Sequence, residues 1–266
     1  MNYDVVGGGG SKAYSYIGAL KKVNLSKVKA VSGSSAGSLI GFFICLTKSS
    51  QKIEEIATDE RYFIFDENDI DIHNFLPFYG FNKGDNIERK LEILSEEYCG
   101  FKRPTFSELK AKTDVDFFVT STNISLGECE IFSSKETPDF DVIKALRMSI
   151  SIPLYFTPVI HNEHTYVDGS FFINTPSNCI LENFDDVSVE NSIIIQSEDR
   201  ALNNCNGLFD YFLSIFHMVR RKLNNKMDTS KFKKVSIDTK NFSLIDHKCD
   251  KVSIKNMIEH GFNSFI

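Results

Sequence analysis

The start of the chain alternates short apolar runs with stretches that carry apolar residues at helical spacing. The run YDVV at 3–6 ends in four glycines, which is typical of a buried strand that enters a tight loop. Helical spacing follows in residues 12–23, and residues 28–33 form a second apolar run. Residues 36–47 are apolar on nearly all sides and predict a buried helix. This order of elements indicates a parallel α/β core.

The rest of the chain continues this mixture after one polar interruption. Residues 51–112 are more polar and irregular, and we expect them to form helices and loops over the core and to act as a lid. Beyond them, apolar runs predict strands and helical spacing predicts helices. The expected strands are 114–124, 128–134, 164–176 (broken at Asp168) and 192–197, and the expected helices are 140–149, 207–223 and 251–265.

Composition and charge narrow the class of protein. The chain has 266 residues, of which 42% are hydrophobic and 25% charged, as in ordinary globular proteins. A net charge of −6 gives no general attraction for nucleic acid, and we expect no nucleic-acid partner. The six cysteines are far apart and lack metal-ligand spacing, which predicts reduced thiols and no bound metal. The chain does not start with a signal peptide, and its longest apolar run is too short to span a bilayer, so we expect a soluble protein.

The turn GSSAG at 33–37 places Ser35 between Gly33 and Gly37. A nucleophilic serine on a sharp strand-to-helix turn needs small neighbours, because its backbone is strained and larger neighbours would clash. Its hydroxyl then lies at a helix N-terminus, where backbone amides favour negative charge. The bare pattern fits an ordinary loop equally well. Its position between an apolar strand and an apolar helix favours the nucleophile.

The glycine-rich loop at 7–12 admits several interpretations. A phosphate-binding P-loop would end in glycine, lysine and Ser/Thr, which this loop does not. A dinucleotide loop would be followed by an acidic residue about twenty positions on, and the chain has none between positions 4 and 54. An oxyanion hole formed by the amides of Gly8, Gly9 and Gly10 fits better. A flexible connection is the remaining alternative, although four glycines carry an entropic cost.

A third candidate lies in YVDGS at 166–170, where a strand breaks at Asp168 and Gly169. An aspartate at such a break can orient or deprotonate a serine. An isolated Asp-Gly pair is more commonly a turn in which the aspartate caps its own backbone. The residues alone leave both interpretations open.

Four segments, in this order, resemble the patatin-like phospholipase family. They are GGGSKAYSYIGAL (8–20), GSSAG (33–37), ALRMSISIPLYFTPV (145–159) and VDGSFFINTP (167–176). The resemblance implies an α/β fold, a three-layer α/β/α sandwich around a central, mostly parallel sheet. It implies one catalytic domain over 1–266, with the motifs in 3–197 and a helical part of no assigned role in 198–266. Two positions depart from the family pattern. Ala13 stands where the family usually has glycine, and Ser170 stands where it usually has Gly or Ala.

The resemblance also implies a chemistry. Ser35 would be the nucleophile and Asp168 its partner in a Ser–Asp dyad. The protein would be a lipid acyl hydrolase of phospholipase A type, acting on acyl esters of phospholipids through an acyl-enzyme and needing no cofactor. The residues expected to stabilise the oxyanion are Gly8, Gly9 and Gly10, with Gly9 and Gly10 foremost, and those expected to support the site are Lys12, Gly33, Gly37 and Gly169.

Two other functions stay open. A Ser-Asp-His esterase of the α/β-hydrolase type also uses such a turn, but several strands precede the serine there and only one does here. Its histidine would be His247 or His260, which follow Asp168 in the chain. A non-enzymatic nucleotide-binding module built on the glycine loop is the other alternative, and the missing acidic residue argues against it.

Membrane contact is a further expectation. Residues 12–52 hold seven lysines and no acidic residue, and residues 208–223 combine an apolar stripe with a basic end. Such a helix can lie on an anionic interface, but a core helix with a basic last turn has the same pattern and is favoured, because apolar stripes on helices usually face the core. We expect a cytoplasmic protein, peripheral at membranes, with an activating protein as a candidate partner. The stripe comprises Leu208, Phe212, Ile215, Phe216 and Val219, followed by Arg220, Arg221 and Lys222.

Overall fold

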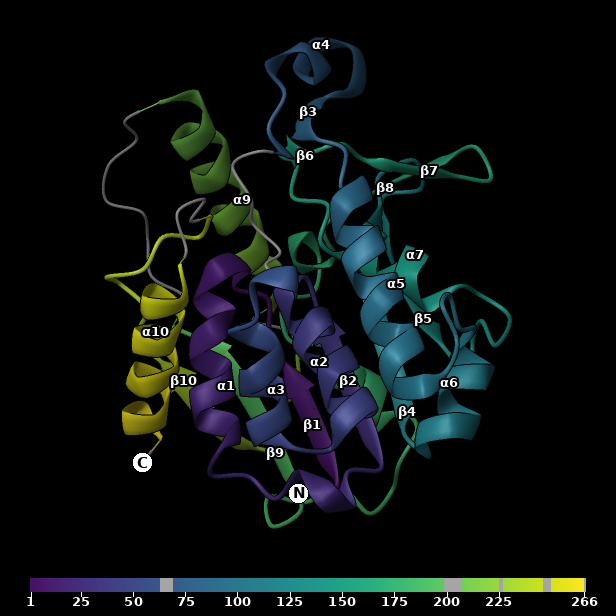
Figure 1. Cartoon of the computed structure of the whole chain (residues 1–266), viewed down its shortest axis with the longest axis vertical. Helices are drawn as coiled ribbons and strands as arrows, with labels where there is room; N and C mark the ends of the chain where they lie inside the picture. Colours follow the sequence, from purple (N-terminus) through teal and green to yellow (C-terminus); the bar gives the residue numbers. More distant parts are fainter. Residues whose placement is uncertain (63–68, 199–206, 225–226, 246–249, 266) are drawn as a thin grey trace.

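The centre of the molecule is an eight-stranded, mostly parallel sheet (Figure 1). The computed structural model describes residues 1–62, 69–198, 207–224, 227–245 and 250–265. The strands lie in the order β10-β9-β1-β2-β4-β8-β7, with β5 paired to β4, and β3 and β6 form a separate pair. The strands are β1 (Tyr3–Val6), β2 (Ala30–Ser34), β3 (Gly80–Asn82), β4 (Asp116–Asn123), β5 (Glu128–Ser133), β6 (Leu154–Phe156), β7 (Val159–His161), β8 (His164–Val167), β9 (Ser192–Ser197) and β10 (Lys233–Ile237).

Helices cover both faces of this sheet. Alternate residues of a strand point to opposite faces, so Val6 packs into the larger hydrophobic cluster and Val5 into a smaller one under α8. The α-helices are α1 (Tyr14–Leu20), α2 (Ala36–Thr47), α3 (Ser50–Ala57), α4 (Phe75–Phe78), α5 (Asp85–Cys99), α6 (Phe106–Thr113), α7 (Val142–Ser149), α8 (Asn178–Leu181), α9 (Leu208–Asn224) and α10 (Lys251–Ser264). The short 3₁₀-helices are η1 (Gly10–Ala13), η2 (Leu25–Lys27), η3 (Glu60–Tyr62), η5 (Ile72–Asn74) and η6 (Gly169–Phe171).

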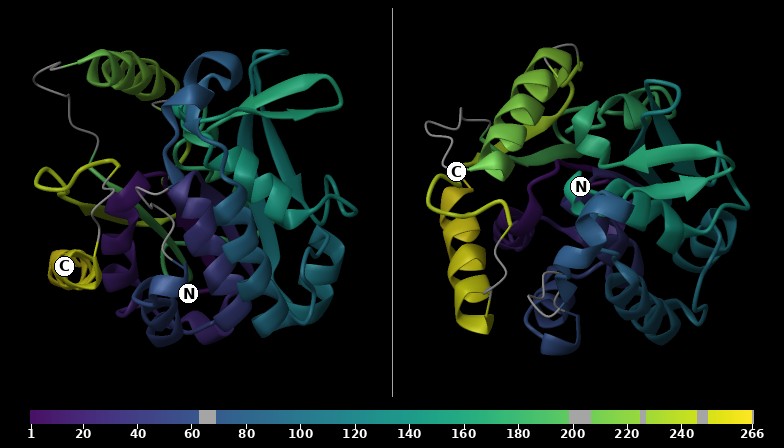
Figure 2. Two further views of the ribbon diagram at one scale, coloured as in Figure 1. Left: turned by 45° about the horizontal axis from the view of Figure 1, so that its top comes forward. Right: turned by 90° about the horizontal axis from the view of Figure 1, so that it is seen from above.

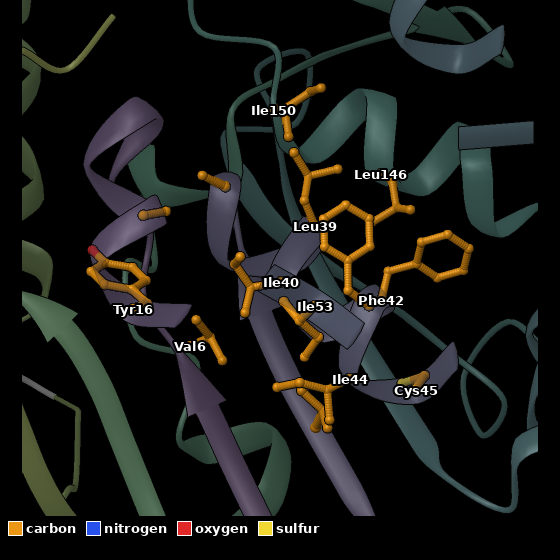
Figure 3. Close-up of a cluster of buried hydrophobic side chains, with 14 of the residues drawn as sticks. Val6, Tyr16, Leu39, Ile40, Phe42, Ile44, Cys45, Ile53, Leu146 and Ile150 are labelled. Atoms are coloured by element: carbon orange, nitrogen blue, oxygen red, sulfur yellow. The ribbon is translucent and has the colours of Figure 1, made fainter. Parts of the chain in front are cut away.

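The helix predicted over 36–47 is confirmed as α2, and it is buried as expected. It lies between the sheet and helices α3, α5 and α7, which explains why its sequence is apolar on nearly every side. Figure 3 shows Ile40, Phe42 and Ile44 of this helix inside the larger cluster, close to Val6 of β1. Among the helices that the structure describes, none is both long and apolar enough to cross a membrane.

The segment 51–112 contributes more to the core than its polar sequence suggests. Ile53 of α3, Leu91 of α5 and Leu109 of α6 are buried in the larger cluster. Residues 69–84 are the part that stands away from the sheet, with α4 at its far end (Figure 1). The function of this segment as a lid stays a prediction.

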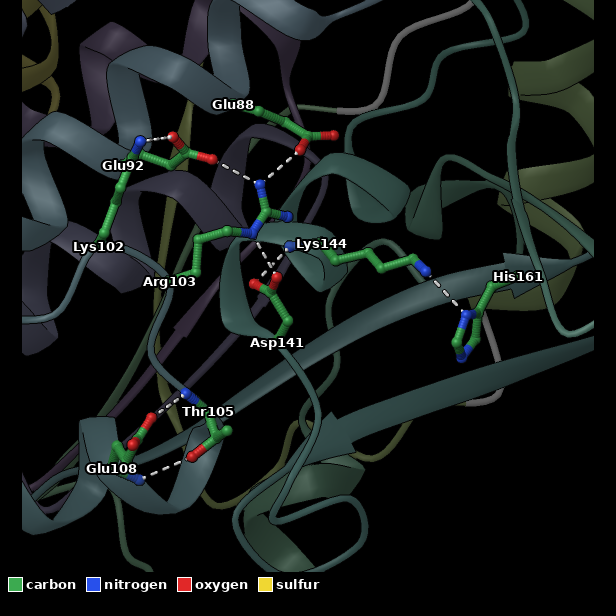
Figure 4. A network of polar contacts seen from close by, with 9 residues as sticks. All are labelled: Glu88, Glu92, Lys102, Arg103, Thr105, Glu108, Asp141, Lys144 and His161. Atoms are coloured by element: carbon green, nitrogen blue, oxygen red, sulfur yellow. Dashed lines mark hydrogen bonds and ion pairs between the residues drawn. The ribbon is translucent and has the colours of Figure 1, made fainter.

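A polar network fastens α5 to the beginning of α7 (Figure 4). The Arg103 guanidinium donates to Glu88 at 2.9 Å and to Glu92 at 2.6 Å, both on α5. It also donates at 2.6 Å to Asp141, whose side chain caps α7 by accepting the Lys144 N–H. The network fixes the position of α7, and the other end of this helix reaches the candidate active site.

Four strands were not expected from the sequence. β3, β6 and β7 have three residues each, too few to show an alternating pattern. β10 lies at the edge of the sheet and buries only Val235 and Ile237, so its sequence is mostly polar. The helix predicted over 12–23 begins with a 3₁₀ turn, η1, and continues as α1. The strand predicted over 164–176 is β8 alone, because the chain turns into η6 directly after Asp168.

Candidate active site

β4 brings the two candidate catalytic residues together, because it pairs with three strands. β5 runs along one edge of β4 over residues 118–123. The other edge is shared: β2 pairs with residues 116–120, and β8 pairs with Thr122 and Asn123. Since β2 is parallel to β4 and β8 is antiparallel, the carboxyl ends of β2 and β8 meet. Ser35 and Asp168 follow these ends and are therefore neighbours, although 133 positions separate them.

The Ser35 hydroxyl donates a hydrogen bond of 2.5 Å to Oδ2 of Asp168. Ser35 is 3% exposed and Asp168 is fully buried. Ser35 stands directly before α2 with a φ of 53° and a ψ of −133°, a conformation that side-chain-bearing residues rarely adopt. The sharp turn between strand and helix that the sequence predicted is therefore present, and its strain aims the hydroxyl at the carboxylate.

The environment of Asp168 keeps its carboxylate oriented. Oδ1 accepts the backbone N–H of Ser170 at 2.8 Å and its hydroxyl at 2.5 Å, which leaves Oδ2 for Ser35. Burial raises the pKa of Asp168 to about 6, while the hydrogen bonds from Ser170 and Ser35 and the positive charge of Arg220 act to lower it. Asp168 is thus ionised at neutral pH and is a stronger base than an exposed aspartate.

The carboxyl end of α7 holds both members of the pair. The Ser149 hydroxyl accepts the backbone N–H of Ser35 at 2.9 Å, and the carbonyl of Ser151 accepts the backbone N–H of Asp168 at 2.9 Å. The buried guanidinium of Arg147 donates to the Ser151 hydroxyl at 2.5 Å. Sequence reasoning assigned no function to these three residues. Their segment, 145–159, matched the family pattern, but polar residues after a helix carry no spacing that identifies a supporting role.

The glycine loop lies beside Ser35, and its amides differ in what they contact. The Gly8 N–H donates to the carbonyl of Asn174 at 3.1 Å and is therefore engaged. Within the part of the chain that the structure describes, the amides of Gly9 and Gly10 donate to no protein acceptor. Gly10 has a φ of 54°, and a Cβ there would lie 2.1 Å from the carbonyl oxygen of Leu244, so this position requires glycine.

The residues expected to support the site lie around it. A Cβ on Gly37 would lie 2.2 Å from the carbonyl oxygen of Val6, so the first turn of α2 packs directly on the end of β1 and the glycine loop. Gly33 closes the other side of the Ser35 turn, and Gly169 lies against the backbone of β4. Lys12 is half-buried in η1, next to the loop.

The helix considered for membrane contact, α9, buries only part of its predicted stripe: Phe212 and Val219 are half-buried and Ile215 is exposed. Phe216 is buried and packs on Phe171 with ring centroids 5.1 Å apart. Arg220 is also buried, and its Nη1 donates to Oδ1 of Asn174 at 3.3 Å. The side chain of Leu208 lies outside the described part of the structure. One side of α9 thus packs as a core helix does, while Tyr211, Ile215 and Met218 are exposed.

The hydrogen bonds that the structure describes at the Ser35 and Asp168 side chains involve no histidine. His260 lies on α10, where Nε2 is 2.7 Å from the carbonyl oxygen of Asp238. His247 lies outside the described residues. Over the described ranges, no three His, Cys, Asp or Glu side chains gather as metal ligands would. The geometry therefore favours a serine and an aspartate acting together.

Two curated viral proteins are similar to this chain. Protein R571 of Acanthamoeba polyphaga mimivirus is 25% identical over 270 residues, which cover 97% of this chain and 90% of that protein. Probable lipid hydrolase 463L of Invertebrate iridescent virus 6 is 28% identical over 191 residues, which cover 67% of this chain and 62% of that protein. The similarity to R571 thus spans nearly the whole chain, while the one to 463L spans about two thirds of it.

A solved structure supports the fold. VipD from Legionella pneumophila superposes with a TM-score of 0.61 over 99% of this chain and 66% of its own, at 14% identity. This confirms the predicted three-layer α/β/α architecture. The family model described as patatin-like phospholipase matches residues 5–178, a range that contains both Ser35 and Asp168. The chain therefore belongs to the patatin-like phospholipase family.

Proposed function

We propose that this protein is a lipid acyl hydrolase of phospholipase A type, with Ser35 as nucleophile and Asp168 as general base. The observation that carries the proposal is the 2.5 Å hydrogen bond between the Ser35 hydroxyl and the Asp168 carboxylate. The pair is buried and lies at the N-terminus of α2, in a chain of the patatin-like phospholipase family. Similarity to a probable lipid hydrolase supports an ester of a lipid as substrate.

In the first half of the reaction, Ser35 Oγ attacks the carbonyl carbon of the acyl ester. Its proton passes to Oδ2 of Asp168, which already accepts this hydrogen bond. The amides of Gly9 and Gly10 stabilise the negative charge on the carbonyl oxygen, and each such donor is typically worth about 10²- to 10³-fold in rate. The Gly8 amide would first have to leave Asn174 to take part. Collapse of the tetrahedral intermediate releases the alcohol, which takes the proton from Asp168.

In the second half, water attacks the acyl-enzyme. Asp168 takes a proton from this water, the ester bond to Ser35 Oγ breaks, and the serine oxygen regains the proton. The fatty acid leaves, and the hydrogen bond between the two side chains forms again. Asp168 can take a proton in both steps because it is ionised at neutral pH and has a raised pKa of about 6.

The test is covalent labelling with a fluorophosphonate probe. The wild-type protein is expected to be labelled and Ser35→Ala is not, while Ser34→Ala, a change at the neighbouring buried serine, keeps the label. Asp168→Asn should lose about 10²-fold or more of its hydrolysis of a water-soluble ester and stay folded by circular dichroism. Persistent labelling of Ser35→Ala would place the nucleophile elsewhere, and near-normal turnover by Asp168→Asn would remove this residue from the mechanism.

A further inference from the structure

Exposed apolar side chains gather on one projecting segment, residues 69–82, which we call the tip. Of the sixteen large hydrophobic residues that are exposed in the described part of the structure, five lie between positions 70 and 79. Ile72 is 72% exposed, Leu76 81% and Tyr79 69%. The tip consists of η5, α4 and β3 and stands away from the sheet in Figures 1 and 2. Such a concentration marks an interaction surface.

The tip is a folded element with an interior of its own. Phe75 stacks on Phe81 with ring centroids 4.5 Å apart and an angle of 15° between the ring planes. The backbone N–H of Asp71 donates to the carbonyl of Phe81 at 2.9 Å and joins the two arms of the segment. Asn74 is buried. The ring stacking and the backbone hydrogen bond fix the conformation of the tip. Ile72 and Leu76 are therefore exposed in its folded form.

The chemistry of this surface is that of a segment between water and hydrocarbon. Residues 72–82, IHNFLPFYGFN, contain no Asp, Glu, Lys or Arg. At the edge of this stretch, the Lys83 ammonium lies 4.6 Å from the centre of the Phe78 ring. Tyrosine and lysine at the border of an apolar surface are typical of the membrane–water interface, where their polar ends stay hydrated.

The base of the tip is joined to the active site. β3 pairs with β6, and Arg147 binds both sides of this pair, donating to the carbonyl of Lys83 at 2.7 Å and to that of Thr157 at 2.9 Å. The same guanidinium contacts Ser151, whose carbonyl holds the Asp168 backbone. In Figure 1 the tip stands at the end of the molecule toward which β1 points, which is the end that carries the dyad.

We propose that the tip inserts into the surface of a phospholipid bilayer and holds the active-site end of the sheet against it. This inference rests on the proposed function, because an active site that hydrolyses membrane lipids has to face the bilayer. A fluid lipid surface adapts to a convex tip whose residues 72–82 contain no Asp, Glu, Lys or Arg. A protein partner, including a second copy of this chain, would have to offer a matching hollow with a polar rim.

The proposal differs from an electrostatic attachment. Asp69, Asp71 and Asp85 flank this stretch, and Lys83 is the one Lys or Arg between positions 69 and 85. Apolar insertion therefore dominates, and anionic lipid is not required. We expect binding to vesicles of pure phosphatidylcholine, with little change when the salt concentration is raised.

The first experiment uses the absence of tryptophan from this chain. Leu76→Trp places a single fluorophore on the tip, and Val252→Trp places one on α10 at a residue that is 64% exposed. Both carry Ser35→Ala, so that the vesicles are not hydrolysed. On addition of phosphatidylcholine vesicles, the emission of Leu76→Trp should shift to the blue and that of Val252→Trp should not. A tip tryptophan that stays as exposed as the control would overturn the proposal.

The second experiment measures co-sedimentation with the same vesicles, again with Ser35→Ala present. Leu76→Asp and Ile72→Asp should each lower the partition coefficient roughly tenfold or more, because burying one such side chain in hydrocarbon accounts for at least that factor. Val252→Asp should bind as the parent protein does. Both tip residues are exposed, so circular dichroism should show the same fold.

Each outcome of these two experiments either supports or overturns the proposal. Loss of binding by the tip variants alone supports the proposal. Equal binding by all variants, or no binding by the parent protein, overturns it, and a parent protein that is dimeric in solution and becomes monomeric in Leu76→Asp would show that a second copy covers the tip. The binding assays need no turnover. Failure of the proposed chemistry would appear separately, as an absence of Ser35-dependent hydrolysis of a soluble ester.

Discussion

A carboxylate that has no hydrogen-bond partner among the described residues lies in the centre of the sheet, outside the active site. Asp4 is fully buried in β1, beside Val31 of β2 and Ile193 of β9, and both neighbours belong to the larger hydrophobic cluster. Neither carboxylate oxygen has a hydrogen-bond partner among the described residues. Burial raises the pKa of Asp4 from 3.8 to about 7. We predict that Asp4→Asn makes the protein more stable at neutral and alkaline pH.

The sign follows from proton binding. Between pH 3.8 and about 7 the folded state holds a proton on Asp4 that the unfolded state releases, so the free energy of unfolding falls as the pH rises through this range. One pKa unit corresponds to about 1.4 kcal/mol, so the full difference from the wild type reaches about 4 kcal/mol. About 3 kcal/mol of it develops between pH 5 and pH 8.

The assay is urea unfolding of the wild type and Asp4→Asn at pH 5 and pH 8. The stability of the variant relative to the wild type should rise between the two values and change little above pH 8. Asp116→Asn is the matched control on β4, which β2 separates from β1, since Asp116 has an ion pair with Lys110 at 2.7 Å. It should show no such gain. A difference between wild type and Asp4→Asn that is the same at both pH values would refute the reasoning.

Two further predictions concern the active site. For a soluble ester, kcat/KM should fall about tenfold per pH unit below pH 6, because protonated Asp168 cannot accept the proton of Ser35; a rate that stays constant down to pH 4 would contradict this. Gly37→Ala should lose activity and melt at a lower temperature, because its Cβ meets backbone at 2.2 Å, whereas Gly207→Ala meets open space and should behave as the wild type does. Equal activity and melting of these two variants would count against the packing described here.

Structure was best predicted from the sequence where the residue types of a short segment require a particular local conformation. Ser35 lies between two glycines, after an apolar run and before an apolar helix. This pattern predicts a strained turn, and the φ of 53° at Ser35 agrees with it. The same holds for α2 and β9, whose residues are buried nearly throughout, so that composition alone marks them.

Features that depend on distant partners could not be predicted in this way. β3 exists because it pairs with β6, more than seventy positions away, and neither has a pattern of its own. Ser149 becomes important only because Ser35 lies beside it in the fold. The basic end of α9 fitted both a membrane surface and a core helix, and helical spacing could not reveal that Arg220 is buried next to Asn174.

The edge of β4 that β2 and β8 share also determines when a growing polypeptide can bring Ser35 and Asp168 together. The glycine loop, Ser35 and α2 leave the ribosome early, but Asp168 follows 133 positions later. It reaches the serine only after β4 has joined β2 and β8 has paired with the remaining part of that edge. Under the proposed mechanism, a nascent or truncated chain that ends before β8 therefore carries the nucleophile without its base. Synthesis itself would delay the proposed hydrolysis until β8 has formed, while β9 and β10 are still to be made.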